Sequence, residues 1–184
     1  AWTNQVLKPL GIQLNLKIWE MTVAYYAVQN YTLDMPLWFY FGQPKGGNKG
    51  TFYSVPPHVT PGQVKMSTDF TFNIFDSPEQ ASGKPDPRIL TYIQEFITTY
   101  LNGIAPTTIP GSADTCFFVM PPDEDFIIDR HPAHPQVIIA SPCSGHGFKL
   151  GAVMGLRLAR TIVEGGDPAA HARWAAGLEG DKPS

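Results

Sequence analysis

The segment that most constrains the fold lies near the C-terminus, where an apolar strand leads through a glycine-containing turn into a helix. The strand is expected over 136–141 (QVIIAS) and the turn over 144–147 (SGHG). The helix is expected from about Phe148 to Val163, because apolar residues recur there at helical spacing before two glycines end it. A chain with this segment combines strand and helix in one folded unit.

The turn suits a ligand that carries negative charge. Gly145 and Gly147 let a backbone approach a ligand closely, and the following helix points its free N–H groups toward the turn. Lys149, in the first helical turn, adds a positive charge. Candidate ligands are a nucleotide phosphate and the anionic N1–C2=O end of a reduced flavin. Glycine spacing alone leaves a third interpretation open, a tight turn that only packs the helix on the sheet.

Much of the chain before this segment alternates with period two and predicts an antiparallel sheet. Leu14, Leu16 and Ile18 begin the alternation, which places the first strand from Ile12 onward. Turns rich in proline and glycine, PKGGNKG and PPHVTPG, separate the strands that follow. These further strands are expected over 37–42, 51–55 and 63–72.

One helix and two more strands complete the expected elements. Asp86 can cap a helix with proline in its first turn, and apolar residues at helical spacing extend it over 87–101. Strands are expected over 115–120 (TCFFVM) and 125–129 (DFIID), and a short amphipathic segment ends at Gly11. The prediction is an α+β fold dominated by an antiparallel sheet.

Composition excludes several classes of protein. The 184 residues suit about one domain, and 43% hydrophobic with 16% charged residues fit a packed globular chain. A net charge of −3 with scattered basic residues argues against nucleic-acid binding. No apolar run reaches the ~18–20 residues of a membrane span, and no signal-peptide pattern is present, so we expect a cytoplasmic protein.

Histidine and cysteine provide few candidate sites by themselves. His131 and His134 stand beside prolines without a third clustered ligand, so we expect surface histidines and no metal site. Cys116 and Cys143 are too few for a secreted disulfide scaffold. From residue type alone, each cysteine is first a small buried hydrophobe and then a reactive thiol.

A longer string identifies a family resemblance. The string PDEDFIIDRHPAHPQVIIASPCSGHGFKLGAVMG resembles the C-terminal signature of the sarcosine oxidase and N-methyltryptophan oxidase family of flavin-dependent amine oxidases. In that signature a cysteine precedes a P-D-E-x-F-I-I-D segment and a G-H-G-F-K turn follows it. The resemblance extends from residue 1 to about 167. It implies an antiparallel substrate-binding sheet joined to the C-terminal strand–turn–helix part of a Rossmann-like FAD domain.

The resemblance also implies a division of the chain. Residues 1–12 would end an FAD-binding portion, 13–115 would form the substrate domain, 116–167 would return to the FAD domain, and 168–184 would be a tail. The fingerprint G-x-G-x-x-G of the family's N-terminal half is absent from this sequence. We therefore expect a second chain or another part of a precursor to supply that half.

The matched positions imply a cofactor site for FAD. Cys116 stands where monomeric members of the family attach the flavin through a thioether to its 8-methyl carbon, whereas Cys143 is interpreted as a packing residue. Lys149 matches the lysine that pairs with the substrate carboxylate in sarcosine-type members. The cofactor-binding residues expected at the turn are Ser144, Gly145, His146, Gly147, Phe148 and Lys149.

Three residues of the expected sheet resemble family positions near the substrate. Tyr53 resembles a tyrosine that orients an amine or carboxylate, although a plain strand aromatic is nearly as well supported. Lys65 resembles the lysine over the flavin N5 edge, where a cation favours oxygen reduction. Asp69 stands where the family has histidine, so the substrate is expected to differ from plain sarcosine and to interact with this carboxylate.

The implied reaction removes a hydride equivalent from the carbon next to a neutral amine. The flavin accepts it, the resulting imine is hydrolysed, and oxygen returns the flavin to its oxidised form with production of hydrogen peroxide. Two alternatives stay open: a flavin dehydrogenase that passes its electrons to a carrier, and a scaffold subunit without cofactor. Peroxide production separates the first alternative, and a bound yellow cofactor separates the second.

Overall fold

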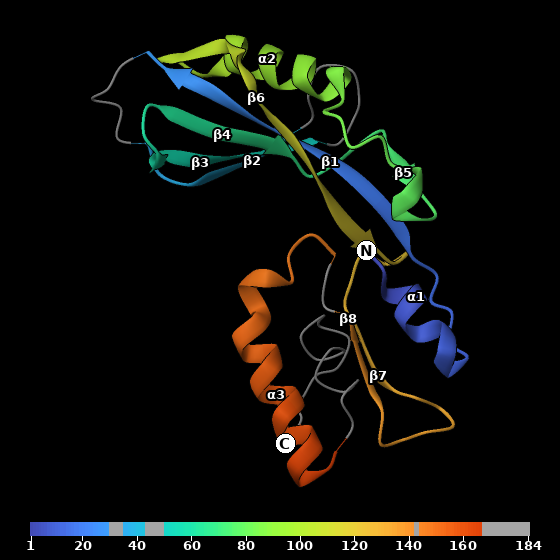
Figure 1. Cartoon of the computed structure of the whole chain (residues 1–184). Coiled ribbons are helices and arrows are strands. Elements are labelled where there is room, and N and C mark those ends of the chain that lie inside the picture. The colour runs from blue at the N-terminus through green and yellow to red at the C-terminus, as the bar shows by residue number, and fades with distance from the viewer. Residues whose placement is uncertain (30–34, 43–49, 142–143, 167–184) are drawn as a thin grey trace. The chain divides into compact units, whose positions relative to one another are not determined.

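A computed structural model divides the chain into two compact units (Figure 1). It describes residues 1–29, 35–42, 50–141 and 144–166, so Cys143 and the tail over 168–184 lie outside the described residues. Unit 1 comprises Ala1–Lys17 and Phe118–Ser184, and unit 2 comprises Ile18–Phe117. In the described parts of the chain, no helix is long and apolar enough to cross a membrane.

Unit 2 is built on an antiparallel sheet. The strands follow the order β2-β3-β4-β1-β5, and β6 also pairs with β1. Their bounds are β1 Lys17–Val28, β2 Trp38–Gly42, β3 Gly50–Thr60, β4 Gln63–Thr68, β5 Ile74–Phe75 and β6 Ile104–Met120. The antiparallel pairing of β1 with β4, β2 with β3 and β3 with β4 confirms the α+β fold expected from the sequence.

Helix α2 (Pro87–Tyr100) covers one face of this sheet, as Figure 1 shows. It begins where expected, because Asp86 accepts a hydrogen bond from the Arg88 amide at 2.8 Å, and Pro87 follows as the first helical residue. Its apolar side buries Ile93 and Phe96 against Phe52 and other sheet residues. Each such side chain contributes about 1.5–3 kcal/mol when fully buried, so this interface is the core of unit 2.

The strands place alternate residues on opposite faces. On β4, Val64 and Met66 are fully buried in the α2 core, whereas Lys65 between them is half-buried. On β3, Phe52 belongs to the core and Tyr53 follows on the other face. The sheet therefore has one face that packs against α2 and a second face that carries polar and aromatic residues.

Several strands begin or end at other positions than the sequence predicts, and β3 continues to Thr60 through Pro56 and Pro57, which the sequence assigns to a turn. Residues 12–16 are not strand. The Asn4 side chain donates from Nδ2 to the Leu14 carbonyl and accepts at Oδ1 from the Leu14 amide, both at 2.9 Å, and so ties this segment to the N-terminal helix. β4 ends at Thr68 instead of residue 72, since the Asp69 carboxylate accepts a hydrogen bond from the Thr51 amide at 2.9 Å. A side chain here replaces the ladder bonds that a longer strand would make.

The longest strand was largely missed. The sequence predicts a strand only over 115–120, because Pro106, Pro110 and Gly111 indicate a loop before it. In the structure β6 begins at Ile104. In the described residues β6 pairs with β1 alone. A strand bonded on one side tolerates proline, because a missing N–H on its other side breaks no ladder bond.

Unit 1 contains a hairpin and two helical segments. Helix α1 (Thr3–Leu7) continues as the 3₁₀ helix η1 (Lys8–Leu10), and β7 (Ile127–Arg130) pairs antiparallel with β8 (Ile138–Ser141). A 3₁₀ turn, η3 (Phe148–Leu150), precedes helix α3 (Gly151–Glu164). The expected helix thus exists, but its α-helical part begins at Gly151 instead of Phe148.

Candidate functional site

The predicted site residues fall into two groups, each within one unit. Tyr53, Lys65, Asp69 and Cys116 belong to unit 2, and the turn over 144–149 belongs to unit 1. Each group has its own geometry.

The first group follows from the register of the sheet. Phe39 of β2 lies opposite Tyr53 of β3, Tyr53 lies opposite Ser67 of β4, and Ser67 lies opposite Val23 of β1. Residues directly opposite one another in antiparallel strands share a face and have Cβ atoms about 4.5–5.5 Å apart. These side chains therefore form one row across four strands on the face away from α2.

Lys65 lies in the neighbouring row of the same face. It is opposite Val55 of β3 and Tyr25 of β1, two residues along β4 from Ser67. Diagonal neighbours on one sheet face are about 7–8 Å apart, within reach of a lysine side chain. Lys65 is therefore positioned to place a positive charge beside the row of Tyr53.

Tyr53 is half-buried and interacts with two members of this region. Burial raises the pKa of its phenol, a hydrogen bond with the Ser67 side chain opposes that rise, and the nearby Cys116 adds to it. Ser67 is fully buried and donates a 2.7 Å hydrogen bond from Oγ to the Thr22 carbonyl. The phenol therefore stays protonated near neutral pH. Because the Ser67 proton goes to Thr22, the phenol donates its proton to Ser67, and the phenol oxygen can accept a hydrogen bond from a ligand.

Cys116 is an exposed free cysteine on β6. Partial burial of its sulfur raises the pKa of the thiol, the positive charge of Lys65 lowers it, and the negative charge of Asp114 raises it. Since Lys65 and Tyr53 both act on this thiol, we name Tyr53, Lys65, Ser67 and Cys116 the sheet-face cluster. Burial is the largest of these effects, so the pKa of this reachable thiol lies above its ordinary value, and Lys65 is the group that lowers it.

Asp69 directly follows the end of β4. It is exposed, its Oδ1 accepts from the Thr51 amide at 2.9 Å, and its own amide donates to the Thr51 carbonyl at 3.1 Å. It is four residues from Lys65 on the chain, with the Tyr53 row between them. The substrate role predicted for Asp69 thus falls on a carboxylate that also ends a strand.

The second group is the turn of unit 1. Ser144 and Gly145 both have left-handed backbones, with φ of 42° and 70°. The Ser144 amide donates to the Val119 carbonyl at 3.1 Å, and its hydroxyl donates to the Asp125 carbonyl at 2.6 Å. These bonds hold the turn against the end of β6 and against the segment that precedes β7.

His146 stabilises the turn with its side chain, whereas the sequence suggested only a backbone role. Its Nδ1 lies 2.5 Å from the Ser144 carbonyl, so this nitrogen carries the proton. Its ring lies 4.8 Å from the ring of Phe126, centroid to centroid. The turn is therefore preorganised by its own residues, which suits a site that binds a planar ligand along its backbone.

Phe148 and Lys149 lie in η3 with exposed side chains. The amides of Leu150 and Gly151 already donate to the carbonyls of Gly147 and Phe148. The N–H groups of Leu150 and Gly151, expected from the sequence to be free at the start of the helix, are therefore not available to a ligand at the turn. The Lys149 ammonium remains close enough in sequence to contribute charge to that ligand.

The structure corrects the prediction for one histidine. His131 is buried and not a surface residue: its Nε2 lies 2.8 Å from the Leu10 carbonyl, and its Nδ1 accepts from the amides of Ala133 and His134 at 3.0 and 3.1 Å. It serves to join η1 to the hairpin. Among the described residues, no group of three histidine, cysteine or acidic side chains could hold a metal ion.

Sequence reasoning missed the residues that complete the sheet face. Ser67 supports Tyr53, Asp114 acts on Cys116, and Phe39 lies opposite Tyr53. The signal that could have found Phe39 and Ser67 was the strand alternation. Each is next in sequence to a residue that faces the core, so each is expected on the opposite face of the sheet. The pairing register itself is set by tertiary packing and cannot be read from a local sequence pattern.

The chain is similar in sequence to known oxidoreductases. Residues 1–161 match the family model described as FAD dependent oxidoreductase (DAO). The chain is 30% identical to the peroxisomal sarcosine oxidase of Homo sapiens, covering 84% of this chain and 40% of that protein. It is 29% identical to the N-methyl-L-tryptophan oxidase of Citrobacter koseri, covering 92% of this chain and 43% of that one.

A solved structure shares the fold. NikD, an unusual amino acid oxidase essential for nikkomycin biosynthesis, matches in its open form with a TM-score of 0.72 and 26% identity. The match covers 90% of this chain and 43% of NikD. The chain thus spans about two fifths of the length of the proteins it matches.

Proposed function

Because the chain belongs to the DAO family of FAD-dependent oxidoreductases, we propose that it forms the C-terminal portion or subunit of an FAD-dependent oxidase. The proposed substrate is an amino acid or secondary amine, whose C–N bond is oxidised to an imine with production of hydrogen peroxide. The observation that carries this proposal is the sheet-face cluster, which combines a free thiol, a cation and a half-buried phenol.

The residues of both groups fit FAD. Bound FAD would supply the two-electron chemistry, taking electrons from the amine and passing them to oxygen. The proposed covalent link joins the Cys116 sulfur to the flavin 8-methyl carbon. A C–S bond forms, the thiol and the methyl group each lose a proton, and oxygen takes the two electrons released. Burial holds the pKa of the Cys116 thiol above its ordinary value, and the charge of Lys65 opposes that rise and so favours the thiolate that this step needs.

The turn would hold the cofactor and the substrate carboxylate. Amides from Gly145 to Lys149 are proposed to bind the anionic edge of the flavin ring, supported by the left-handed backbone of Ser144 and Gly145. Lys149 is proposed to pair with the carboxylate of an amino-acid substrate as a point charge.

On the sheet face, three roles are proposed. Tyr53 accepts a hydrogen bond from the substrate amine at its phenol oxygen and so orients the substrate, because the phenol proton is directed to Ser67. Lys65 stabilises the negative charge that develops when oxygen is reduced. Asp69 offers a carboxylate to a cationic part of the substrate, although one of its oxygens is held by Thr51.

A further polypeptide segment is proposed to complete the cofactor site. The sequence contains no G-x-G-x-x-G, and the proteins it matches are more than twice its length. A second chain or another part of a precursor carrying that fingerprint would bind the adenosine and pyrophosphate. Co-purification of such a segment with this chain would support the proposal, and a flavin-loaded chain on its own would contradict it.

The test of function is the absorption spectrum and mass of this chain after acid precipitation of the assembly that also contains the segment with the dinucleotide fingerprint. Flavin absorbance that stays with the denatured chain, and a mass raised by that of FAD, are expected for wild type. Cys116→Ser should release the flavin, whereas Cys143→Ser, the matched control, should retain it. Flavin that washes out of the wild-type protein would refute attachment but not binding, and protein that never contains flavin would refute both.

Oxidase and dehydrogenase activity are separated by the two half-reactions. Lys65→Met should slow reoxidation of the reduced flavin by oxygen far more than it slows anaerobic reduction by the amine, because the negative charge develops on oxygen. Stopped-flow absorbance measures each rate. Equal slowing of both would instead give Lys65 a structural role, and slow oxygen reaction in wild type would favour a dehydrogenase.

A further inference from the structure

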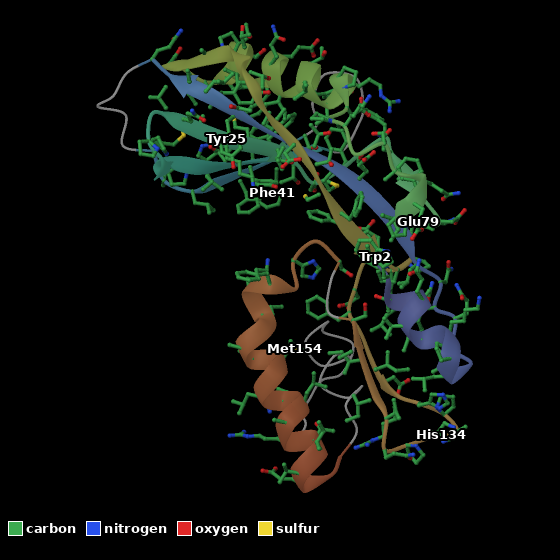
Figure 2. All side chains as sticks on the ribbon, viewed as in Figure 1. Trp2, Tyr25, Phe41, Glu79, His134 and Met154 are labelled. Atoms are coloured by element: carbon green, nitrogen blue, oxygen red, sulfur yellow. The ribbon has the colours of Figure 1, made fainter. Side chains whose placement is uncertain are left out.

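Two phenylalanines of β2 extend the sheet-face cluster without a role in the proposed reaction. Phe39 is 54% exposed and Phe41 is 80% exposed. Their rings lie 6.2 Å apart at an interplanar angle of 17°, and the Phe39 ring lies 5.7 Å from that of Tyr53. Figure 2 shows Phe41 on the side of the sheet away from α2. The three rings therefore form one aromatic surface, which we name the β2–β3 aromatic surface.

The core does not need these two rings. The alternate residues of β2, Trp38 and Tyr40, provide the aromatic contacts with α2, at 5.8 and 5.0 Å from the Phe96 ring. A sheet face that meets only water ordinarily carries polar residues, whereas Phe39 and Phe41 expose large apolar rings. The position of these rings on the opposite face indicates that they contact something other than the core.

The aromatic surface adjoins the reactive groups. Tyr53 belongs to both, since its ring stacks beside Phe39 and its phenol interacts with Ser67 and Cys116. Lys65 lies one row away, at the diagonal separation of about 7–8 Å. An aromatic amino acid is long enough to place its amine beside this row while its ring lies on Phe39. Sarcosine has no side chain to fill the same space.

We propose that Phe39, supported by Phe41 and Tyr53, binds the side chain of the substrate, and that this substrate carries a flat aromatic group. The inference rests on the proposed oxidase function and specifies its substrate class. Offset stacking and edge contacts between aromatic rings stabilise such a complex beyond simple burial, which selects aromatic over aliphatic side chains of similar size.

The test compares three amines on the FAD-containing protein in the assembly that includes this chain. Anaerobic flavin reduction is followed with sarcosine, N-methylleucine and N-methylphenylalanine. We expect the limiting rate divided by the apparent dissociation constant to be about 10- to 100-fold higher for N-methylphenylalanine than for sarcosine. N-Methylleucine should be intermediate, because it fills the space without an aromatic ring.

The variants assign the preference to residues. Phe39→Ala should remove at least tenfold of the preference for N-methylphenylalanine over sarcosine. Phe39→Leu keeps the apolar volume and should lose the preference only in part, and it serves if the alanine variant does not fold. Tyr100→Ala is the matched control, since Tyr100 is 53% exposed and stacks on Tyr40 on the α2 side.

A binding measurement tests the same surface without turnover. Phenylacetate, which cannot be oxidised as an amine, should bind wild type at least tenfold more tightly than acetate by isothermal titration, and Phe39→Ala should abolish the difference. Equal binding of both acids, or a wild type that prefers sarcosine, overturns the aromatic substrate while the oxidase stands. Failure of every amine to reduce the flavin overturns the proposed oxidase itself.

Discussion

Gly145→Ala tests whether the turn of unit 1 is held in the conformation described. Gly145 has φ of 70°, and an added Cβ would lie 2.7 Å from Cε2 and 2.8 Å from Cδ2 of Phe118. Atoms at this distance overlap, so the ring or the turn must move. Two separable costs follow: about 1–2 kcal/mol for a non-glycine residue in the left-handed region, and about 1–3 kcal/mol for the overpacked contact.

Gly11→Ala is the matched control for the first cost. Gly11 has φ of 71°, lies in the same unit, and has no atom within 4 Å of an added Cβ. It should therefore lose only the backbone contribution of about 1–2 kcal/mol. The excess loss in Gly145→Ala, about 1–3 kcal/mol, measures the contact with Phe118.

Urea unfolding followed by circular dichroism measures both losses in the free energy of unfolding. A double-mutant cycle with Phe118→Leu should show coupling, because the smaller side chain makes room for the new Cβ. Gly145→Ala should also lower the flavin content, since the Ser144 amide bond to Val119 is next to the strained residue. Equal losses for the two glycines, with no coupling to Phe118, would refute the described turn.

Three further predictions concern single charged groups. Lys149→Met should weaken binding of an amino-acid substrate by roughly tenfold or more at unchanged flavin content, as measured by titration of the flavin spectrum. Lys65→Met should raise the pKa of the Cys116 thiol and Asp114→Asn should lower it, so that in cofactor-free chain the first variant reacts more slowly and the second faster with a disulfide reagent at pH 8. Asp86→Ala should cost about 1–2 kcal/mol in urea unfolding at pH 7 through loss of the α2 cap. Because Arg88 lowers the pKa of Asp86, its contribution is full above the ordinary value of 3.8 and is lost as the pH falls below it, so the deficit of the variant should shrink in acid.

The sequence predicted elements whose signals are local. Helix α2 was placed to within one residue, because Asp86, a following proline and an apolar stripe are all contained in the segment itself. The extent of β6 was missed, because pairing with β1 overrides the local preference of two prolines and a glycine. The strand predicted over 12–16 was wrong for a similar reason, since hydrogen bonds from the Asn4 side chain fix the conformation of this segment.

The candidate site divides in the same way. The turn over 144–149 was found from adjacent residues, although the side-chain bond of His146 and the 3₁₀ geometry before α3 were not. Tyr53, Lys65 and Cys116 were suggested only by family resemblance, because they come from three strands. Their arrangement depends on the register of β3 with β4 and on the path of β6.

The register that builds this face is fixed from the opposite face. Val64 and Met66 of β4 fit the α2 core beside Phe52 of β3, and a slip of β4 by one residue would exchange the two β4 residues for Lys65 and Ser67. Burying an unpaired lysine ammonium costs several kcal/mol, so such a slip is strongly disfavoured. The core therefore selects one register, and that register puts the Lys65 cation one row from Tyr53. Substitutions beneath the sheet that loosen the α2 core should consequently disturb the spacing of the sheet-face cluster before they unfold the unit.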